Sequence, residues 1–322
     1  MPAWSKPMRE RDIILTGIPR SGTTLVCWLL NQLPHVVALV EPWLGWRFAL
    51  TRNPERAYRE VVRFFGRARL KILTGRSVFS HRVYGEVPTN TIEERRREGS
   101  LRRSQARLGR IRLPKEVAPD FRLVVKHVGV FTALLEGLTH CFPTYALVRN
   151  PLSVLASWNS VALPVRQGRL PMAERLDPSL RRMLRRRSDR FERQICLLSW
   201  FFETYRRVLP PSAVLRYEDI VQSGGRALGA IIPEAARLDV PLQSRNVSPL
   251  YDPSLVRALG ERLLRTDGSY WEFYSREDVE RLLEHSTPPG SSPARCPIQG
   301  SRGDPDRRTV NDHACRRLGS LL

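Results

Sequence analysis

The sequence predicts an α/β fold with three layers, in which helices cover both faces of a central parallel sheet. Two observations lead to this prediction. Short apolar segments of strand length alternate with longer stretches of helical periodicity, as in proteins whose parallel strands are buried on both faces. A glycine-rich loop also joins the first of these strands directly to a helix. The expected strands are residues 12–16, 36–40, 121–126, 144–148 and 213–216.

Helical periodicity covers most of the chain between these strands, and the expected helices are residues 23–33, 131–140, 152–161 and 187–208. One connection, from about residue 45 to 120, is too long for a simple crossover. It carries a helix-like stretch (54–73) and then an arginine-rich run (93–112). We predict a helical insertion between the second and third strands, lying over the strand ends where open α/β sheets bind ligands. A second basic run (181–193) opens the long helix. We interpret each run as a solvated helix face, and an anion-binding surface is the second interpretation.

The domain boundaries follow from composition. With 322 residues, the chain is long enough for one large domain, and we assign residues 1–285 to a single α/β domain. Residues 286–322 open with a stretch rich in Pro, Gly and Ser and then lose apolar periodicity, which predicts a disordered tail. No apolar run approaches the ~20 residues that span a bilayer, and residues 1–12 lack the apolar segment of a signal peptide. We therefore expect a cytoplasmic protein without a membrane span.

The charge is strongly basic, with 53 Lys and Arg against 32 Asp and Glu, a net charge of +21. Such a surplus is compatible with nucleic acid, an anionic membrane or a phosphorylated cofactor as partner. Only four of these residues are lysines, and the basic residues are spread along the whole chain. That pattern is equally typical of codon bias in a GC-rich genome, so charge alone decides little.

The five cysteines form no C-x-x-C pair, so the sequence supports neither a disulfide framework nor a zinc site. Cys27, Cys141 and Cys196 have apolar neighbours, and we expect them to be packed, reduced thiols. No metal site is predicted.

The most informative segment runs from the first strand through a loop into an apolar helix. Gly17 and Gly22 stand five residues apart, and Thr23 and Thr24 open the helix. Glycines let the backbone approach an anion closely, while the loop and helix N–H groups point at it. In the strand–loop–helix context this spacing favours phosphate binding over an ordinary tight turn. The nucleotide-hydrolysing loop has a lysine where this chain has Thr23, and here the cation stands inside the loop, at Arg20. A ligand without a triphosphate, bound without a metal, is indicated.

This loop resembles that of sulfotransferases that use 3′-phosphoadenosine 5′-phosphosulfate (PAPS). The resemblance implies that the loop grips the 5′-phosphosulfate of PAPS. It assigns cofactor binding to Gly17, Pro19, Arg20, Ser21, Gly22, Thr23 and Thr24.

A second anion site is indicated where the fourth strand meets its helix. Asn150 is a good helix N-cap and Pro151 suits the first helical position, which leaves Arg149 at the strand end beside a helix N-terminus. Alone, this pattern is better explained by a capped helix with a surface arginine. An R-N-P sequence with Ser157 eight residues after the arginine is, however, similar to the 3′-phosphate site of the same family. The resemblance implies that Arg149 and Ser157 hold the 3′-phosphate of PAPS.

Candidate catalytic residues follow the second and third strands. Glu41 directly follows the strand 36–40. The resemblance to glycan and tyrosylprotein sulfotransferases implies that it is the general base. The alternative is a carboxylate that only caps the strand end or forms a salt bridge. Lys126 ends an apolar strand in a chain with few lysines, and resembles the family lysine that contacts the transferring sulfuryl group or the leaving oxygen. His127 is a rival base, or a neutral packed histidine. With Arg20, these residues form the predicted catalytic set.

The last matching segment is Tyr217-Glu218-Asp219, which resembles a family motif whose tyrosine approaches the adenine while the acids brace the loop. The resemblance also predicts a helix over 224–237. Residues 244–246 are candidates for a cofactor-covering loop. The R-K-G-x-x-G loop of cytosolic small-molecule sulfotransferases is missing from this sequence. The chain is thus more similar to the glycan, tyrosylprotein and bacterial members of the family.

Together these motifs predict in-line transfer of a sulfuryl group from PAPS to a hydroxyl acceptor, such as a sugar or a lipid head group, without a metal. The acceptor would be recognised by residues 45–120 and 161–185, and Trp43, Trp46 and Phe48 could also fit it. A P-loop kinase or NTPase remains the alternative enzyme, although the missing lysine disfavours it. A basic nucleic-acid-binding protein without catalysis, or a degenerate family member that only binds the product PAP, is also open. We expect no nucleic acid as partner.

Overall fold

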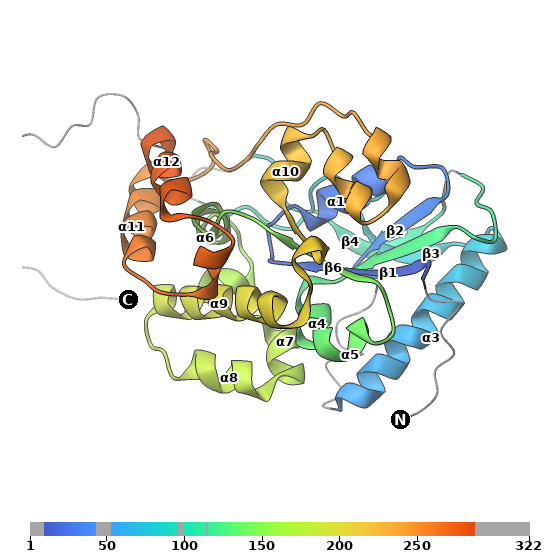
Figure 1. Cartoon of the computed structure of the whole chain (residues 1–322), viewed down its shortest axis with the longest axis horizontal. Coiled ribbons are helices and arrows are strands. Elements are labelled where there is room, and N and C mark those ends of the chain that lie inside the picture. The colour runs from blue at the N-terminus through green and yellow to red at the C-terminus, as the bar shows by residue number, and fades with distance from the viewer. Residues whose placement is uncertain (1–9, 43–52, 96–99, 114, 287–322) are drawn as a thin grey trace, which may run out of the picture. The chain divides into compact units, whose positions relative to one another are not determined.

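The computed structural model describes residues 10–42, 53–95, 100–113 and 115–286. Within these residues the predicted parallel sheet is confirmed: five strands lie in the order β2-β5-β1-β6-β7, with every pair parallel (Figure 1). The predicted strands match within one residue at each end. Their bounds are β1 Asp12–Gly17, β2 Val36–Val40, β5 Arg122–Lys126, β6 Thr144–Val148 and β7 Val214–Arg216.

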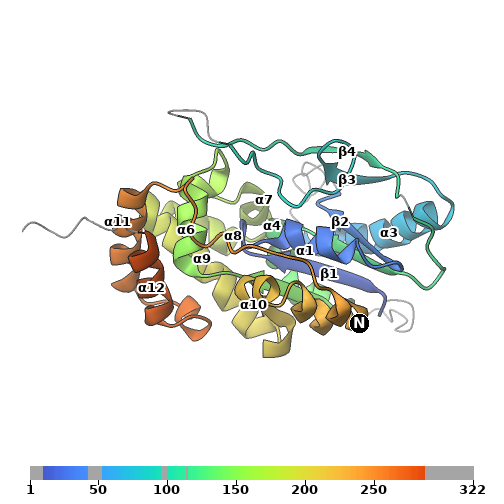
Figure 2. The same cartoon turned by 90° about the horizontal axis from the view of Figure 1, so that it is seen from above.

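Helices cover both faces of the sheet, which confirms the three layers (Figures 1 and 2). On one face α1 (Thr23–Leu30), α10 (Tyr217–Gln222) and two 3₁₀ turns pack over Leu15, Ala38 and Val124. The other face is covered by α3 (Pro54–Leu73), α4 (Val128–Ala133) and α5 (Leu135–Thr139). Strands that are buried on both faces need apolar side chains in both directions, which is why their sequences read as continuous apolar runs.

A third apolar cluster lies beside β6 and is formed mainly by helices. Its centre is α6 (Pro151–Asn159), whose nine residues are all buried, and α9 (Arg190–Val208). The remaining helices of this region are α7 (Pro171–Leu176), α8 (Pro178–Arg185), α11 (Pro253–Leu264) and α12 (Arg276–Ser286).

The insertion between β2 and β5 is only partly helical, which corrects the prediction. The helix α3 is present at its predicted position, but an antiparallel hairpin follows it, with β3 (Val78–Arg82) paired to β4 (Arg107–Ile111). The arginine-rich run 93–112, expected as a helix face, therefore contains a strand. Val78, Ser80 and Ile111 are buried in this hairpin, so tertiary burial decides the conformation of a run whose charges suggested a helix.

Two other predicted helices also differ from the structure. The second basic run does not open the long helix: α8 ends at Arg185, and Asp189 caps a new helix, so α9 begins at Arg190. The predicted helix 224–237 is two 3₁₀ turns, Arg226–Ala230 and Pro233–Arg237. Gly225 has a φ of 97°, which breaks a right-handed helix at its start. The predicted stretch 131–140 is likewise divided into α4 and α5.

Some predictions lie outside the described residues. They concern the tail beyond Ser286 and the aromatic residues Trp43, Trp46 and Phe48. Among the described helices, none combines the length and apolarity that crossing a membrane requires.

Candidate active site

A pocket of about 890 Å³ lies at the carboxyl edge of the sheet. It receives residues from the end of every strand, and we call it the strand-end pocket. Parallel strands place their carboxyl ends at one edge, so residues distant in the sequence meet there. The residues that follow the strands and line the pocket are Arg20 and Thr23 after β1, Glu41 after β2, Lys126 and His127 at the end of β5, Arg149 after β6, and Tyr217 after β7.

Two hydrogen bonds anchor the loop between β1 and α1 to neighbouring elements. One is made by a carbonyl group of the loop and the other by a hydroxyl group. The indole Nε1 of Trp158 donates to the carbonyl of Pro19 at 2.8 Å, and the Ser21 hydroxyl donates to the carbonyl of Leu147 at 3.0 Å. Gly22 has a φ of 95°, and a Cβ there would lie 2.7 Å from the ring of Tyr217. Glycine is therefore required at this position both for the conformation and for the space.

The open end of this loop is suited to an anion. The N-cap of α1 is Gly22, which provides no side-chain cap, and the first N–H groups of a helix lack intrahelical acceptors. Thr23 and Thr24 line the pocket in the first turn of the helix. Backbone donors, two hydroxyl groups and the positive end of the helix dipole are therefore gathered at one point.

Arg20 extends from the loop toward the second predicted anion site. Its Nε donates to the hydroxyl of Ser157 at 3.2 Å, and its NH1 donates to the side-chain carbonyl of Asn90 at 3.1 Å. The pKa of Arg20 is lowered to about 10, mainly by burial and also by the nearby charges of Arg102 and Arg149, while Tyr251 opposes the shift. The side chain remains charged at neutral pH, in a place where an anionic ligand would relieve the repulsion.

Arg149 lies in the same pocket, within reach of the loop. Its NH1 donates to the carbonyl of Arg20 at 3.0 Å, its Nε donates to Asn246 at 2.8 Å, and its NH2 donates to the carbonyl of Arg245. The guanidinium lies 4.5 Å from the ring centre of Tyr217. These acceptors are neutral, so they orient the guanidinium without cancelling its charge. The two predicted anion sites are thus parts of one pocket.

Residues 244–246 contact Arg149, and Glu218 stabilises this segment through hydrogen bonds. This carboxylate accepts from the backbone N–H of Asn150 at 3.0 Å, from the amide of Asn246 at 2.8 Å and from the Tyr274 hydroxyl at 2.7 Å. Above the pocket, Arg245 is 3.6 Å from Glu94 of the insertion. The segment therefore connects the C-terminal region to the insertion across the pocket, at the position expected of a covering loop.

Glu41 and Lys126 form an ion pair of 2.7 Å at the adjacent ends of β2 and β5. Burial by itself raises the pKa of Glu41, but the ammonium of Lys126, with smaller contributions from His127 and His81, outweighs burial and lowers that pKa to about 2. The carboxylate is therefore ionised at neutral pH. It is also a weak base for as long as Lys126 stays beside it.

His127 is buried and caps α4, where its Nδ1 accepts from the backbone N–H of Val130 at 3.4 Å. Burial lowers its pKa to about 4, with the charge of Glu41 opposing the shift. The ring is neutral at physiological pH and has a structural role as a helix cap. It lines the strand-end pocket beside Lys126, so the structure keeps it within reach of the predicted catalytic pair.

The insertion contributes pocket residues that the sequence analysis missed. They are His81, whose Nδ1 is 3.0 Å from the carbonyl of Glu41; Asn90, which accepts from Arg20; and Arg102, which donates to Ser160 at 2.7 Å. No motif marks these residues, since the insertion has no pattern shared with the loop or the strand ends. The only available signal was the expectation that the insertion covers the carboxyl edge.

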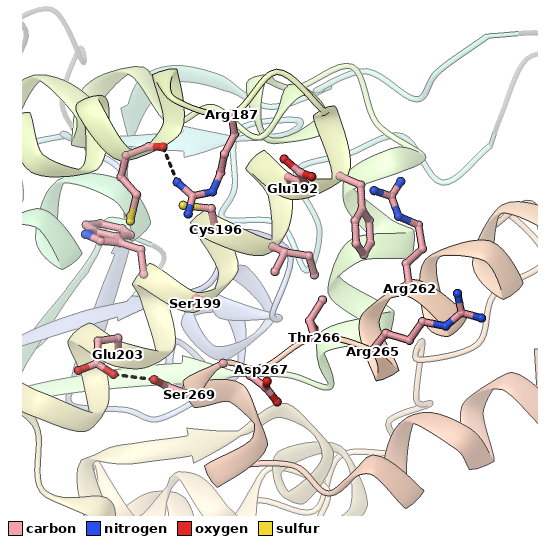
Figure 3. A pocket seen from close by; sticks show the side chains of 15 residues that line it. Arg187, Glu192, Cys196, Ser199, Glu203, Arg262, Arg265, Thr266, Asp267 and Ser269 are labelled. Carbon is pink, nitrogen blue, oxygen red and sulfur yellow. Dashed lines mark hydrogen bonds between the residues drawn. The ribbon is translucent and has the colours of Figure 1, made fainter.

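A second hollow of about 730 Å³ lies between α9 and the segment around α11, and we call it the α9–α11 hollow (Figure 3). Arg262 is paired with Asp189 at 2.9 Å and lies over the ring of Phe191. Arg187 donates to the carbonyl of Met183 (Figure 3). Burial raises the pKa of the Cys196 thiol, which makes it unreactive. In neither hollow, nor elsewhere among the described residues, do three His, Cys, Asp or Glu side chains gather as metal ligands.

Comparisons with known proteins give only distant likenesses, and these lie among solved structures. No protein-family model matches the sequence, and no curated protein is similar to it. Among solved structures, sulfotransferase STF1 from Mycobacterium tuberculosis H37Rv aligns over 86% of this chain and 77% of its own, with 11% identity and a TM-score of 0.28. This is a weak structural resemblance to a sulfotransferase, and a score this low does not establish a common fold. The function has to be argued from the chain's own geometry.

Proposed function

We propose that this protein is a sulfotransferase that moves a sulfuryl group from PAPS to a hydroxyl acceptor. The observation that supports this most directly is the shared pocket of two anion sites and an acid–base pair. Arg149 donates to the backbone of Arg20, Arg20 donates to Ser157, and the pair Glu41–Lys126 lines the same pocket. A ligand with anionic groups at two ends, and a reacting centre near one of them, matches this arrangement.

The donors present suit a nucleotide of this kind. The loop amides with Thr23 and Thr24 would hold the 5′-phosphosulfate, and Arg149 with Ser157 would hold the 3′-phosphate. A phosphate at Arg149 would replace neutral oxygens of Arg245 and Asn246, so we expect residues 244–246 to shift when the nucleotide binds. The stronger charge-assisted hydrogen bonds to phosphate favour that exchange.

When bound, PAPS supplies the sulfuryl group and a phosphate leaving group. Glu41 takes the proton of the acceptor hydroxyl as the oxygen–sulfur bond forms and the bond from sulfur to the 5′-phosphate oxygen breaks. Lys126 and Arg20 neutralise the negative charge that develops on the sulfuryl oxygens and the leaving group. As Lys126 turns from Glu41 toward that charge, the carboxylate loses its closest cation and its pKa rises. The donor thereby makes Glu41 a better base at the moment of transfer.

A binding experiment with matched nucleotides tests the proposal. PAP and AMP differ only by the 3′-phosphate, so PAP should stabilise the protein against heat more than AMP does. Arg149→Ala should weaken PAP binding about 10- to 100-fold, as expected for a charge-assisted contact, and leave AMP binding unchanged. Transfer of ³⁵S from PAPS to a panel of hydroxyl acceptors then identifies the reaction.

Several outcomes would contradict the proposal. Indifference to PAP in the thermal assay would remove its basis, and equal affinity of parent and Arg149→Ala protein for PAPS would show that the 3′-phosphate site is wrongly assigned. Mg²⁺-dependent consumption of ATP would instead support a kinase or NTPase. Tight DNA or RNA binding that falls steeply with salt would support a nucleic-acid-binding protein.

A further inference from the structure

The backbone of Glu41 is held in an unfavourable conformation. Its φ is 42°, in the left-handed region that residues other than glycine seldom adopt, and such strain persists only where the surroundings hold it. The N–H of Glu41 donates to the carbonyl of Lys126 at 2.8 Å, and the carboxylate accepts from the same lysine's ammonium. The carbonyl of Glu41 faces a third group, the Nδ1 of His81, at 3.0 Å. Three contacts therefore fix this one residue.

The contact from His81 belongs to a two-residue clamp on the end of β2. Ser80, fully buried, accepts from the backbone N–H of Val40 at 3.0 Å, while His81 engages the carbonyl of the next residue. Both come from β3, whose pairing with β4 across Ser80↔Gly109 and His81↔Leu108 makes the hairpin a rigid support. The insertion thus holds the backbone of two consecutive residues, Val40 and Glu41, where the candidate base is placed.

The chemistry of the contact determines where the proton of His81 lies. A carbonyl oxygen only accepts hydrogen bonds, so the Nδ1 of His81 must carry a proton, in the neutral or the charged ring. In the neutral ring the Nε2 is then the bare nitrogen, and the ring lines the strand-end pocket. The Nδ1–H has a fixed structural partner, whereas the Nε2 does not take part in the clamp.

We propose that His81 is a positioning residue, whose Nδ1–H holds the strained peptide of Glu41 and so aims the carboxylate at the acceptor hydroxyl. The proposal rests on the proposed function of Glu41 as general base. Without the clamp, Glu41 relaxes toward an ordinary backbone conformation and its carboxylate moves away from the reacting hydroxyl. Misplacement of a reacting group by about 1 Å can reduce the rate on the order of 100-fold.

Two isosteric substitutions separate the two ring nitrogens. His81→Asn keeps an amide N–H close to the position of Nδ1, while His81→Gln places its amide near Nε2 and leaves the Glu41 carbonyl without its donor. We expect His81→Asn to keep kcat within about threefold of the parent, and His81→Gln to lower kcat on the order of 10- to 100-fold. KM for PAPS and for the acceptor should change little in either variant, because the lost interaction acts on the transition state.

Three controls keep the result interpretable. The thermal shift with PAP should be the same for His81→Gln and the parent, which shows that the donor site and the fold are intact. The exposed His140 provides a matched substitution, His140→Asn, that should leave transfer unchanged. In the double variant Glu41→Gln/His81→Gln, the second substitution should add no further loss, since His81 acts only through Glu41.

The possible results are distinguishable. Equal losses in His81→Asn and His81→Gln would overturn the proposal and point to Nε2 as a base. Full transfer in both variants would show that the clamp has no catalytic effect. If the parent transfers no sulfuryl group at all, the proposed function fails. Long-range ¹⁵N–¹H spectra of the neutral ring would still test the clamp itself, which requires a proton on Nδ1 of His81.

Discussion

The strand-end pocket and the α9–α11 hollow are similar in size, about 890 and 730 Å³, yet they differ in charge. Among the described residues that line them, the strand-end pocket has five Lys and Arg against two Asp and Glu, while the hollow has three of each. Arg262 of the hollow is paired with a carboxylate, whereas Arg149 of the pocket is held by neutral oxygens. Uncompensated charge, and not volume, distinguishes the candidate site.

The backbone adds to this difference. The pocket is formed where five strands end and α1 begins, so backbone donors and side chains converge there. The hollow is lined mainly by the sides of α9 and α11 and by the segment 266–269, and backbone groups in the middle of a helix bond within that helix. A net charge of +21 conceals this contrast, because arginine is common throughout the chain. The local balance of charge therefore indicates an anion site more reliably than the total charge does.

The largest expected effect is on sulfuryl transfer, and it compares two single variants that each remove one arginine from one region. Arg20→Ala should lower sulfuryl transfer about 100- to 1000-fold, the loss typical of a single preorganised donor to transition-state charge. Arg262→Ala should leave transfer within about twofold, because Asp189 and Phe191 are its partners and the strand-end pocket is unaffected. Steady-state rates with ³⁵S-PAPS measure both variants. A loss of transfer in Arg262→Ala as large as that in Arg20→Ala would show that charge balance fails to separate the two regions.

The strand-end pocket could be predicted largely from the sequence, because its residues directly follow apolar strands. An apolar run that ends in Glu41, Lys126 or Arg149 places that side chain at the carboxyl edge as soon as the sheet is parallel. The loop glycines and the Asn150 cap are equally local signals, since each depends on neighbours in the sequence. Their roles in binding PAPS stay predictions.

The contribution of the insertion could not be predicted in the same way. His81 lies in β3, and Asn90 and Arg102 lie in the connection from β3 to β4, two strands whose pairing joins segments about 30 residues apart. Neither strand carries a turn motif that would indicate the register, and the arginines of 93–112 suggested a helix. Long-range pairing depends on burial against the rest of the fold, which a local pattern does not contain.

A second prediction concerns how the free energy of unfolding depends on pH through the buried His127. Among the described residues that line it, the α9–α11 hollow has no counterpart to this residue. Its pKa is lowered from 6.5 to about 4, so between these values the unfolded chain binds a proton that the folded chain excludes. Stability should therefore fall as the pH drops through this window, by about 2 kcal/mol from this group between pH 7 and pH 5. Glu41, with its pKa near 2, loses its contribution only at lower pH.

The test is urea unfolding of the parent and of His127→Asn at both pH values. Asparagine is a strong N-cap, so it can keep the hydrogen bond to Val130 while removing the titration. The variant should lose about 2 kcal/mol less than the parent between pH 7 and pH 5. An identical fall in both proteins would mean that His127 is protonated in the folded state.

The smallest expected effect is on PAP binding, and it compares one tryptophan from each region. Both indoles donate a hydrogen bond, but only one of them holds the loop of the strand-end pocket. The indole of Trp158 donates to the loop carbonyl of Pro19, and that of Trp200, beside the hollow, donates to Asp177 at 3.0 Å. Trp158→Phe and Trp200→Phe should each lower the free energy of unfolding by about 1–3 kcal/mol through the lost hydrogen bond. Only Trp158→Phe should also weaken PAP binding, roughly two- to fivefold, because the loop then has to be ordered by the ligand. Calorimetric titration with PAP decides the point: equal affinities in the two variants would show that the anchoring of Pro19 does not preorganise the loop.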